Sequence, residues 1–289
     1  MCSVDFSHPQ NVNLSMASFF NNIKLRYFEL RGSLSKRENN LLLILGIVIF
    51  LVTWHMITVI TKAPSGVFPS PIKVLKSFPE LHFRDALVRN ALYSLYLNQA
   101  GMILSVIAAL PLGFVIGLLP IFRGLTERQI AVFRYLPLTL LIGVFIRWFG
   151  LEDLMKIMFL AVGIFVYLLP TVILRVDEVK QVYVQTVKTL GASRWQIVKT
   201  VFIPDVLSRV FDDIKVLAPI SWTYIIIAEM INKTGGLGAM AYLFGRQSRA
   251  DKAFAVLVII ILIGILLDRI FTTLDRLFFP HKYVVKGGR

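Results

Sequence analysis

The sequence predicts an all-α polytopic membrane protein with about six transmembrane helices. Three observations carry this prediction: of the 289 residues, 56% are hydrophobic and only 17% are charged, and the mean hydropathy is +0.72. Soluble globular domains are less apolar and carry more charge. The net charge of +14 comes from basic residues that flank the apolar segments. That placement is typical of contact with anionic membrane lipid and argues against nucleic-acid binding.

The first helix is expected at residues 41–61, after a polar cytoplasmic N-terminal tail formed by residues 1–40. Residues 41–61 contain no Asp, Glu, Lys or Arg. At 1.5 Å per residue they extend about 30 Å, enough to cross a bilayer. Residues 62–90 are expected to form an extracytoplasmic loop with an interfacial helix, because a stretch rich in Pro, Ser and Gly is followed by mixed apolar and charged residues.

A core transmembrane domain is expected over residues 88–279, with a C-terminal tail at 280–289. Its apolar segments are 91–122, 130–149, 154–174, 210–231 and 253–279. The segment at 210–231 has a polar start, so its membrane part is expected to begin near Val216. In the last segment, charged residues such as Asp275 alternate with an apolar stripe. That pattern predicts an amphipathic helix that leaves the membrane along its surface.

The basic residues also predict the orientation. Six spans place both termini on one side of the membrane. The segments on that side (1–40, 121–129, 175–215 and 269–289) hold nineteen Lys and Arg, and those on the other side (62–90, 150–153 and 232–252) hold nine. Since basic residues concentrate on the cytoplasmic side, we expect cytoplasmic termini and a cytoplasmic loop at 175–209.

Residues 185–204, QTVKTLGASRWQIVKTVFIP, form a polar interruption between two spans. Gly191 is expected to end a short helix in a left-handed conformation. Ser193 is expected to cap a second helix, with Gln196 completing a capping box. Pro204 is expected to stop that helix or bend the chain away. A loop with such defined ends is a candidate docking element for a soluble partner.

The spacing in this loop resembles the cytoplasmic motif of type I ABC importer permease subunits. That motif reads Glu-Ala-Ala, three residues, Gly, nine residues, Ile, one residue, Leu-Pro. This chain has Gln185-Thr186-Val187, Gly191, Val201 and Ile203-Pro204 at those positions. The Glu-Ala-Ala is lost, so Gln185 can contribute a hydrogen bond but no charge.

Further segments resemble one branch of the binding-protein-dependent transport inner-membrane component family. This is the NitT/TauT-like branch of permeases for nitrate, sulfonate, taurine and bicarbonate. The resemblance covers roughly residues 65–279 and is carried by FPSP (68–71), RWFG (147–150), KTLGASRWQIVKTVFIP (188–204), AEM (228–230) and GGLGAMAY (235–242). The chain departs from the branch in keeping only Pro137 of a proline-rich stretch, and in placing Arg147 where an apolar residue is usual.

The resemblance implies a permease subunit in a bacterial cytoplasmic membrane. A second permease subunit, expected to be identical, would complete the translocation path. Separate ABC ATPase subunits would bind ATP and Mg, and an extracytoplasmic solute-binding protein would deliver the solute. This chain has no GxxxxGK[ST] sequence, so we expect it to be no enzyme, with no catalytic residue, metal site or cofactor of its own.

The expected coupling helix is about 192–198, docked in a groove of the ATPase. Trp195, with Ile197 and Val198, would form its apolar anchor, since aromatic anchors with a polar rim suit a protein groove. The alternative for Trp195 is an aromatic at the level of the lipid headgroups. The full set of expected docking residues is Gln185, Gly191, Ala192, Ser193, Arg194, Trp195, Gln196 and Pro204.

Five residues are candidates for the substrate path: Arg147, Ser221, Trp222, Thr223 and Glu229. Each has a plainer alternative. Arg147 can reach the membrane interface instead of attracting an anion. Ser221 and Thr223 can hold helices together, and Glu229 can pair with a neighbouring Lys or Arg at an outer gate.

The leading function is therefore a permease for a small anion such as nitrate, sulfonate, taurine or bicarbonate. A vitamin-precursor or other heterocyclic nutrient is the alternative solute. A membrane enzyme is disfavoured because His55, Arg147 and Glu229 are scattered along the chain. A channel or scaffold would leave the 185–204 loop without a role.

Overall fold

The computed structural model describes residues 32, 34–62, 64, 66–231 and 233–284, and every regular element in them is helical. Residues 1–31 and 33 of the expected N-terminal tail and 285–289 of the expected C-terminal tail lie outside the described residues. The chain divides into two compact units, Met1–Lys62 and Ala63–Arg289.

The first unit contains the helix α2, Lys36–Ile60. It begins five residues before the expected span because Ser35 and Glu38 form a capping box. The backbone N–H of Ser35 donates to Glu38 Oε2 at 2.8 Å, and that of Glu38 donates to Ser35 Oγ at 3.3 Å. No residue of α2 is buried. An apolar helix without buried residues suits a span that contacts lipid.

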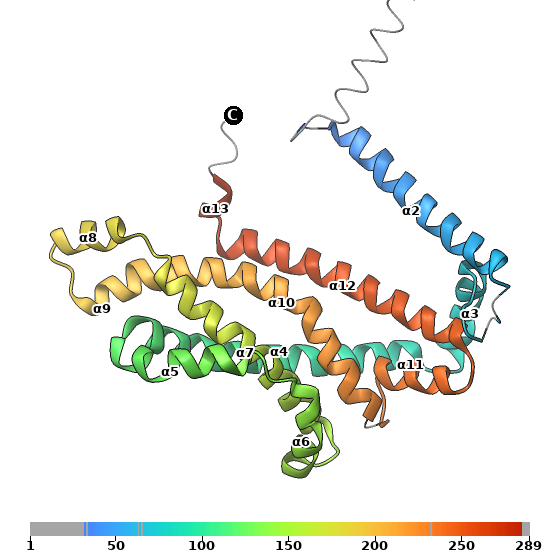
Figure 1. Cartoon of the computed structure of the whole chain (residues 1–289). Coiled ribbons are helices and arrows are strands. Elements are labelled where there is room, and N and C mark those ends of the chain that lie inside the picture. The colour runs from blue at the N-terminus through green and yellow to red at the C-terminus, as the bar shows by residue number, and fades with distance from the viewer. Residues whose placement is uncertain (1–31, 33, 63, 65, 232, 285–289) are drawn as a thin grey trace, which may run out of the picture. The chain divides into compact units, whose positions relative to one another are not determined.

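The second unit is a bundle of helices whose ends carry shorter elements (Figure 1). The order is α3 (Pro71–Phe83), α4 (Leu87–Leu118), α5 (Pro120–Phe133), a 3-10 turn (Leu138–Leu141), α6 (Ile142–Phe149), α7 (Asp153–Asp177), α8 (Gln181–Thr189), α9 (Arg194–Ile197), a π-helical segment (Val198–Phe202), α10 (Ile203–Ile231), α11 (Leu237–Arg246), α12 (Ala250–Phe278) and α13 (His281–Val284). In the described chain, five helices are long and apolar enough to cross a membrane, or six if the bent pair α5 and α6 counts as one span.

Helices α4 and α7 make the most extensive contact of the bundle. Small residues allow this close approach. A methyl group built on Gly113 of α4 would lie 2.5 Å from Val172 Cγ1 of α7, and one on Gly101 would lie 2.6 Å from Leu160 Cδ2. Helix α10 packs against α7 and also contacts α4, so α4, α7 and α10 form the centre of the unit.

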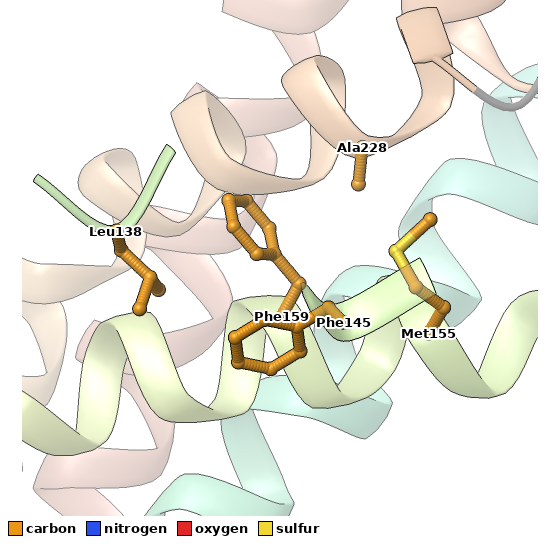
Figure 2. Packing of buried hydrophobic residues seen from close by; sticks show 5 residues of the cluster. All are labelled: Leu138, Phe145, Met155, Phe159 and Ala228. Carbon is orange, nitrogen blue, oxygen red and sulfur yellow. The ribbon is translucent and has the colours of Figure 1, made fainter. Parts of the chain in front are cut away.

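A cluster of buried side chains fixes α6 against this centre (Figure 2). Phe145 of α6 meets Phe159 of α7 edge to face, with ring centroids 5.5 Å apart. Leu138, Met155 and Ala228 complete the cluster. Edge-to-face aromatic pairs favour one orientation, so the short α6 is held although it makes few turns.

The expected span at 130–149 is not one continuous helix. Helix α5 ends at Phe133, and the chain turns by 90° before Leu138–Phe149. Pro137 lies in the break. It lacks a backbone N–H and disfavours a helical conformation of the preceding Leu136, and both effects favour a break in the helix at this point.

Pro204 does not stop the helix that follows Ser193. Residues Arg194–Ile231 form one stretch of 38 helical residues, in which the π-helical segment Val198–Phe202 directly precedes Pro204. A π segment shifts the hydrogen-bonding register within a helix. The missing N–H of proline therefore falls where the register changes, and the helix continues.

The tail of the last segment also differs from expectation. Asp275, expected on a polar surface, is 1% exposed. Its carboxylate accepts hydrogen bonds from Lys215 at 2.8 Å, from Lys282 at 2.9 Å and from the hydroxyl of Tyr283 at 2.6 Å. Long-range pairing with α10 and α13 thus buries a charge that the helical pattern alone places outside.

Candidate functional site

The predicted loop projects at one end of the second unit, where α8 and α9 lie away from α3 and α11 (Figure 1). We call this the loop end, and the end that carries α3 and α11 the opposite end. The turn between α8 and α9 is closed by two hydrogen bonds. Gly191 N–H donates to Lys188 O at 2.9 Å, and Ala192 N–H donates to Val187 O at 3.2 Å. These bonds form a Schellman motif with Gly191 at φ +81°, so the left-handed helix end predicted for Gly191 is confirmed.

The capping box predicted for the second helix is also present. Gln196 N–H donates to Ser193 Oγ at 3.4 Å, and Ser193 N–H donates to Gln196 Oε1 at 2.7 Å. Helix α9 starts directly after this cap. The two motifs fix both ends of a short connection, so α9 is presented in a defined orientation.

The apolar side chains of the loop divide into an exposed and a buried set. Trp195 is 69% exposed and Leu190 is 82% exposed. Ile197 is 6% exposed and Val198 is half-buried, so they face the bundle rather than a partner. Of the expected three-residue anchor, only Trp195 is available for docking. A large exposed aromatic on a polar loop indicates an interaction site.

Ion pairs connect the base of this loop to the bundle. Arg175 near the end of α7 binds both carboxylate oxygens of Asp213 on α10, at 2.8 and 2.7 Å. It also binds Glu178 at 2.7 Å, and Arg209 of α10 reaches Glu178 at 3.3 Å. The Arg175 guanidinium holds the pKa of Glu178 below its ordinary value, and Arg209 adds to this effect. The two helices that enter and leave the loop are therefore joined by charge-assisted hydrogen bonds.

A second polar network lies at the opposite end, where Glu229 is fully buried near the end of α10. Its carboxylate accepts hydrogen bonds from Ser94 Oγ at 2.6 Å and from Gly238 N–H at 2.8 Å. Ser94 Oγ in turn accepts from Leu237 N–H at 2.8 Å. The free N–H groups at the start of α11 are thus satisfied by side chains of α4 and α10. The expected pairing of Glu229 with a neighbouring Lys or Arg is replaced by these hydrogen bonds.

The five path candidates do not converge on one cavity. Ser221 and Trp222 are buried, and Ser221 Oγ accepts a hydrogen bond from Asn98 Nδ2 at 2.8 Å. This bond joins α10 to α4, as expected of small polar residues between membrane helices. Thr223 is exposed on the other side of α10, and Arg147 is exposed near the end of α6.

Sequence reasoning missed Lys156, which is fully buried in the first turns of α7. Its ammonium donates to Tyr93 Oη at 2.9 Å and to Thr234 Oγ1 at 2.8 Å, and it lies 3.5 Å from Asp153 Oδ1. These partners come from three separate segments of the chain, so the sequence does not show that they meet. The only signal for this site in the sequence was a lysine beside an apolar span. Within the described parts of the chain, no cluster of His, Cys, Asp or Glu could hold a metal ion.

The family described as "Binding-protein-dependent transport system inner membrane component" matches residues 101–279 of this chain. The taurine transport system permease protein TauC of Escherichia coli is 26% identical over 81% of this chain and 87% of its own length. The putative aliphatic sulfonates transport permease protein SsuC of Bacillus subtilis is 26% identical over 79% and 83%, respectively. The formylaminopyrimidine transport permease protein ThiX of Halalkalibacterium halodurans is 23% identical over 81% and 93%.

Among solved structures, a chain of the MetNI methionine ABC transporter in an inward-facing conformation has the same fold. The TM-score is 0.58 at 19% sequence identity. The match covers 66% of this chain and 95% of that chain. The expected all-α transmembrane architecture of a type I importer is thereby confirmed.

Proposed function

Since the chain belongs to the family of binding-protein-dependent transport system inner membrane components, we propose that this ABC importer permease carries a small organic anion, with a sulfonate such as taurine as the first candidate. The proposed solute class is supported by the similarity of this chain to taurine and aliphatic sulfonate permeases, which extends over about four fifths of the chain. In the assembly that we propose, a second copy of this chain completes the path. A binding protein delivers the solute, and separate ATPase subunits bind ATP and Mg.

The coupling site that we propose is the connection between α8 and α9. Its support is the combination of a fixed turn at Gly191, a capped helix at Ser193 and the exposed Trp195. An ATPase groove that receives Trp195 would bury most of an aromatic side chain, which is a typical anchor of a protein interface. The ion pairs of Arg175 with Asp213 and Glu178 would then transmit a displacement of the loop to α7 and α10. We propose that the loop lies in the cytoplasm and that, with the bent pair α5 and α6 counted as one of six spans, both termini lie there too.

Substitution of Trp195 tests the coupling site, and the chain offers a matched control. Trp148 on α6 has the same exposed fraction, 69%, but lies outside the loop. We expect Trp195→Ala to lose co-purification of the ATPase and solute uptake without a change in thermal unfolding, because the side chain packs little against its own bundle. Trp148→Ala should keep ATPase binding. Normal ATPase binding and uptake in Trp195→Ala would overturn the proposed site.

Uptake into proteoliposomes tests the solute class. The permease, its ATPase and its binding protein are reconstituted together and offered labelled taurine, nitrate, bicarbonate or formylaminopyrimidine. ATP-dependent uptake of taurine supports the proposal. A heterocyclic nutrient is the second candidate, because the formylaminopyrimidine permease matches 81% of this chain. Uptake of formylaminopyrimidine alone would replace the anion with that alternative.

A further inference from the structure

A cavity of about 360 Å³ lies at the opposite end of the bundle, between the start of α4 and the turn that joins α10 to α11. Its size suits a small molecule. Arg89 and Thr234 on its wall are exposed, so the cavity is accessible from outside the protein. The lining residues are Ala86, Arg89, Asn90, Tyr93, Thr234 and Gly235.

The polar wall of this cavity rests on the buried Lys156. The two lining hydroxyls, Tyr93 Oη and Thr234 Oγ1, both accept hydrogen bonds from its ammonium. The same ammonium lies 4.9 Å from the centroid of the Tyr93 ring. A fully buried ammonium has a high desolvation cost, and apolar packing at the same position would avoid that cost. The ammonium instead hydrogen-bonds two hydroxyls of the cavity wall and fixes their positions.

The charges around the cavity favour an anion. The ion pair of Lys156 is with Asp153, whose side chain is 47% exposed and also accepts from the Tyr93 hydroxyl. Asp153 and the buried Glu229 both interact electrostatically with Lys156, so the positive charge that faces the cavity is that of Arg89. Arg89 makes no ion pair with any residue that the structure describes, and no lining residue carries a carboxylate. The guanidinium is therefore available to bind a carboxylate, sulfonate or nitrate with two parallel hydrogen bonds.

We propose that this cavity is an outer subsite for a small oxyanion, in which Arg89 binds the anionic group and the buried Lys156 holds the Tyr93 and Thr234 side chains of the wall in place. The inference rests on the proposed transport of an anion and assigns the attraction of the solute to Arg89. Arg147, the cationic residue favoured by the sequence, does not line this cavity. The lining residue Asn90 accepts a hydrogen bond from Gly236 N–H at 2.8 Å. An anion in the subsite would therefore lie beside a residue that is bonded to the start of α11.

Charged thiol reagents measure the potential of this cavity without any transport. Thr234→Cys is made in a Cys2→Ser background, which removes the single native cysteine. The purified permease is labelled with 2-sulfonatoethyl methanethiosulfonate, an anion, or with 2-(trimethylammonium)ethyl methanethiosulfonate, a cation. The ratio of the two rates, divided by the same ratio for a free thiol, reports the local charge. Arg89→Gln is then added, with Arg89→Lys as the conservative variant and Arg246→Gln on α11 as the matched control.

We expect a normalised ratio above one that falls about fivefold or more in Arg89→Gln, because removal of a nearby positive charge slows the anionic reagent and speeds the cationic one. Arg89→Lys should retain most of the ratio, and Arg246→Gln should retain nearly all of it. Millimolar methanesulfonate should slow labelling unless Arg89 is replaced. A ratio below one, or equal losses in Arg89→Gln and Arg246→Gln, would overturn the subsite. Absence of taurine uptake by the wild-type assembly would instead contradict the proposed solute alone, because the labelling rates do not depend on uptake.

Discussion

The turn at Gly191 allows a prediction that separates backbone strain from steric clash. A Cβ built at this residue meets no atom within 4 Å, but its φ of +81° lies in the left-handed region. A residue other than glycine costs about 1–2 kcal/mol in that conformation, and a β-branched residue lies at the upper end. If the chain leaves it, the bonds to Lys188 O and Val187 O are lost instead, at about 0.5–1.5 kcal/mol each.

Either route costs Gly191→Val about 2 kcal/mol, which corresponds to a roughly 30-fold weaker interaction with the ATPase. Gly191→Ala should be intermediate. Gly191→Asn should remain near the wild type, because asparagine tolerates the left-handed region. The first assay is the affinity of the ATPase for the permease in nanodiscs. The second is solute uptake per ATP hydrolysed in proteoliposomes. An asparagine variant as damaged as the valine variant, or a valine variant that behaves like the wild type, would refute this reasoning.

Three further predictions concern stability, each measured by thermal or denaturant unfolding of the purified permease. Glu229→Ala should destabilise the permease by about 2–4 kcal/mol, because it leaves a buried N–H and a buried hydroxyl without their acceptor. Glu229→Gln should cost under about 1.5 kcal/mol. Equal losses in the two variants would contradict the hydrogen-bonding role of Glu229. Arg175→Asp or Asp213→Arg alone should destabilise, and the double exchange should recover part of the loss; additive losses would argue against the pair. Hydrogen bonds from Arg249 and Lys252 lower the pKa of Glu80 from 4.5 to about 2. The stability that the ionised Glu80 contributes is complete above pH 4.5 and is lost as the pH falls toward 2. Glu80→Gln should therefore destabilise the permease at pH 7 and have little effect near pH 2. A loss that does not change with pH would contradict it.

Sequence reasoning predicted the turn at Gly191 and the capped start of α9 because their determinants are local. The left-handed end at Gly191 and the capping box of Ser193 with Gln196 depend on residues at most five positions apart. Hydrophobic length likewise indicated the long spans, since a bilayer requires about 20 apolar residues whatever the packing. These features need no knowledge of the tertiary structure.

Features that depend on distant partners could not be predicted in the same way. Asp275 is buried because Lys215 and Lys282 reach it from other helices. Lys156 finds its hydroxyl partners on α4 and on the turn before α11. Pro204 continues a helix because a π-helical segment precedes it, and that register change has no plain sequence signal. In each case tertiary contact or backbone register overrides the local pattern.

Accessibility of residue 195 tests the central claim most directly. Trp195→Cys in the Cys2→Ser background gives one thiol at an exposed position of α9. A membrane-impermeant maleimide is applied to intact cells and to inside-out vesicles, with and without excess ATPase subunit. The account predicts labelling of inside-out vesicles alone and protection by the ATPase. Labelling of intact cells would place the loop on the outer face and contradict its coupling role.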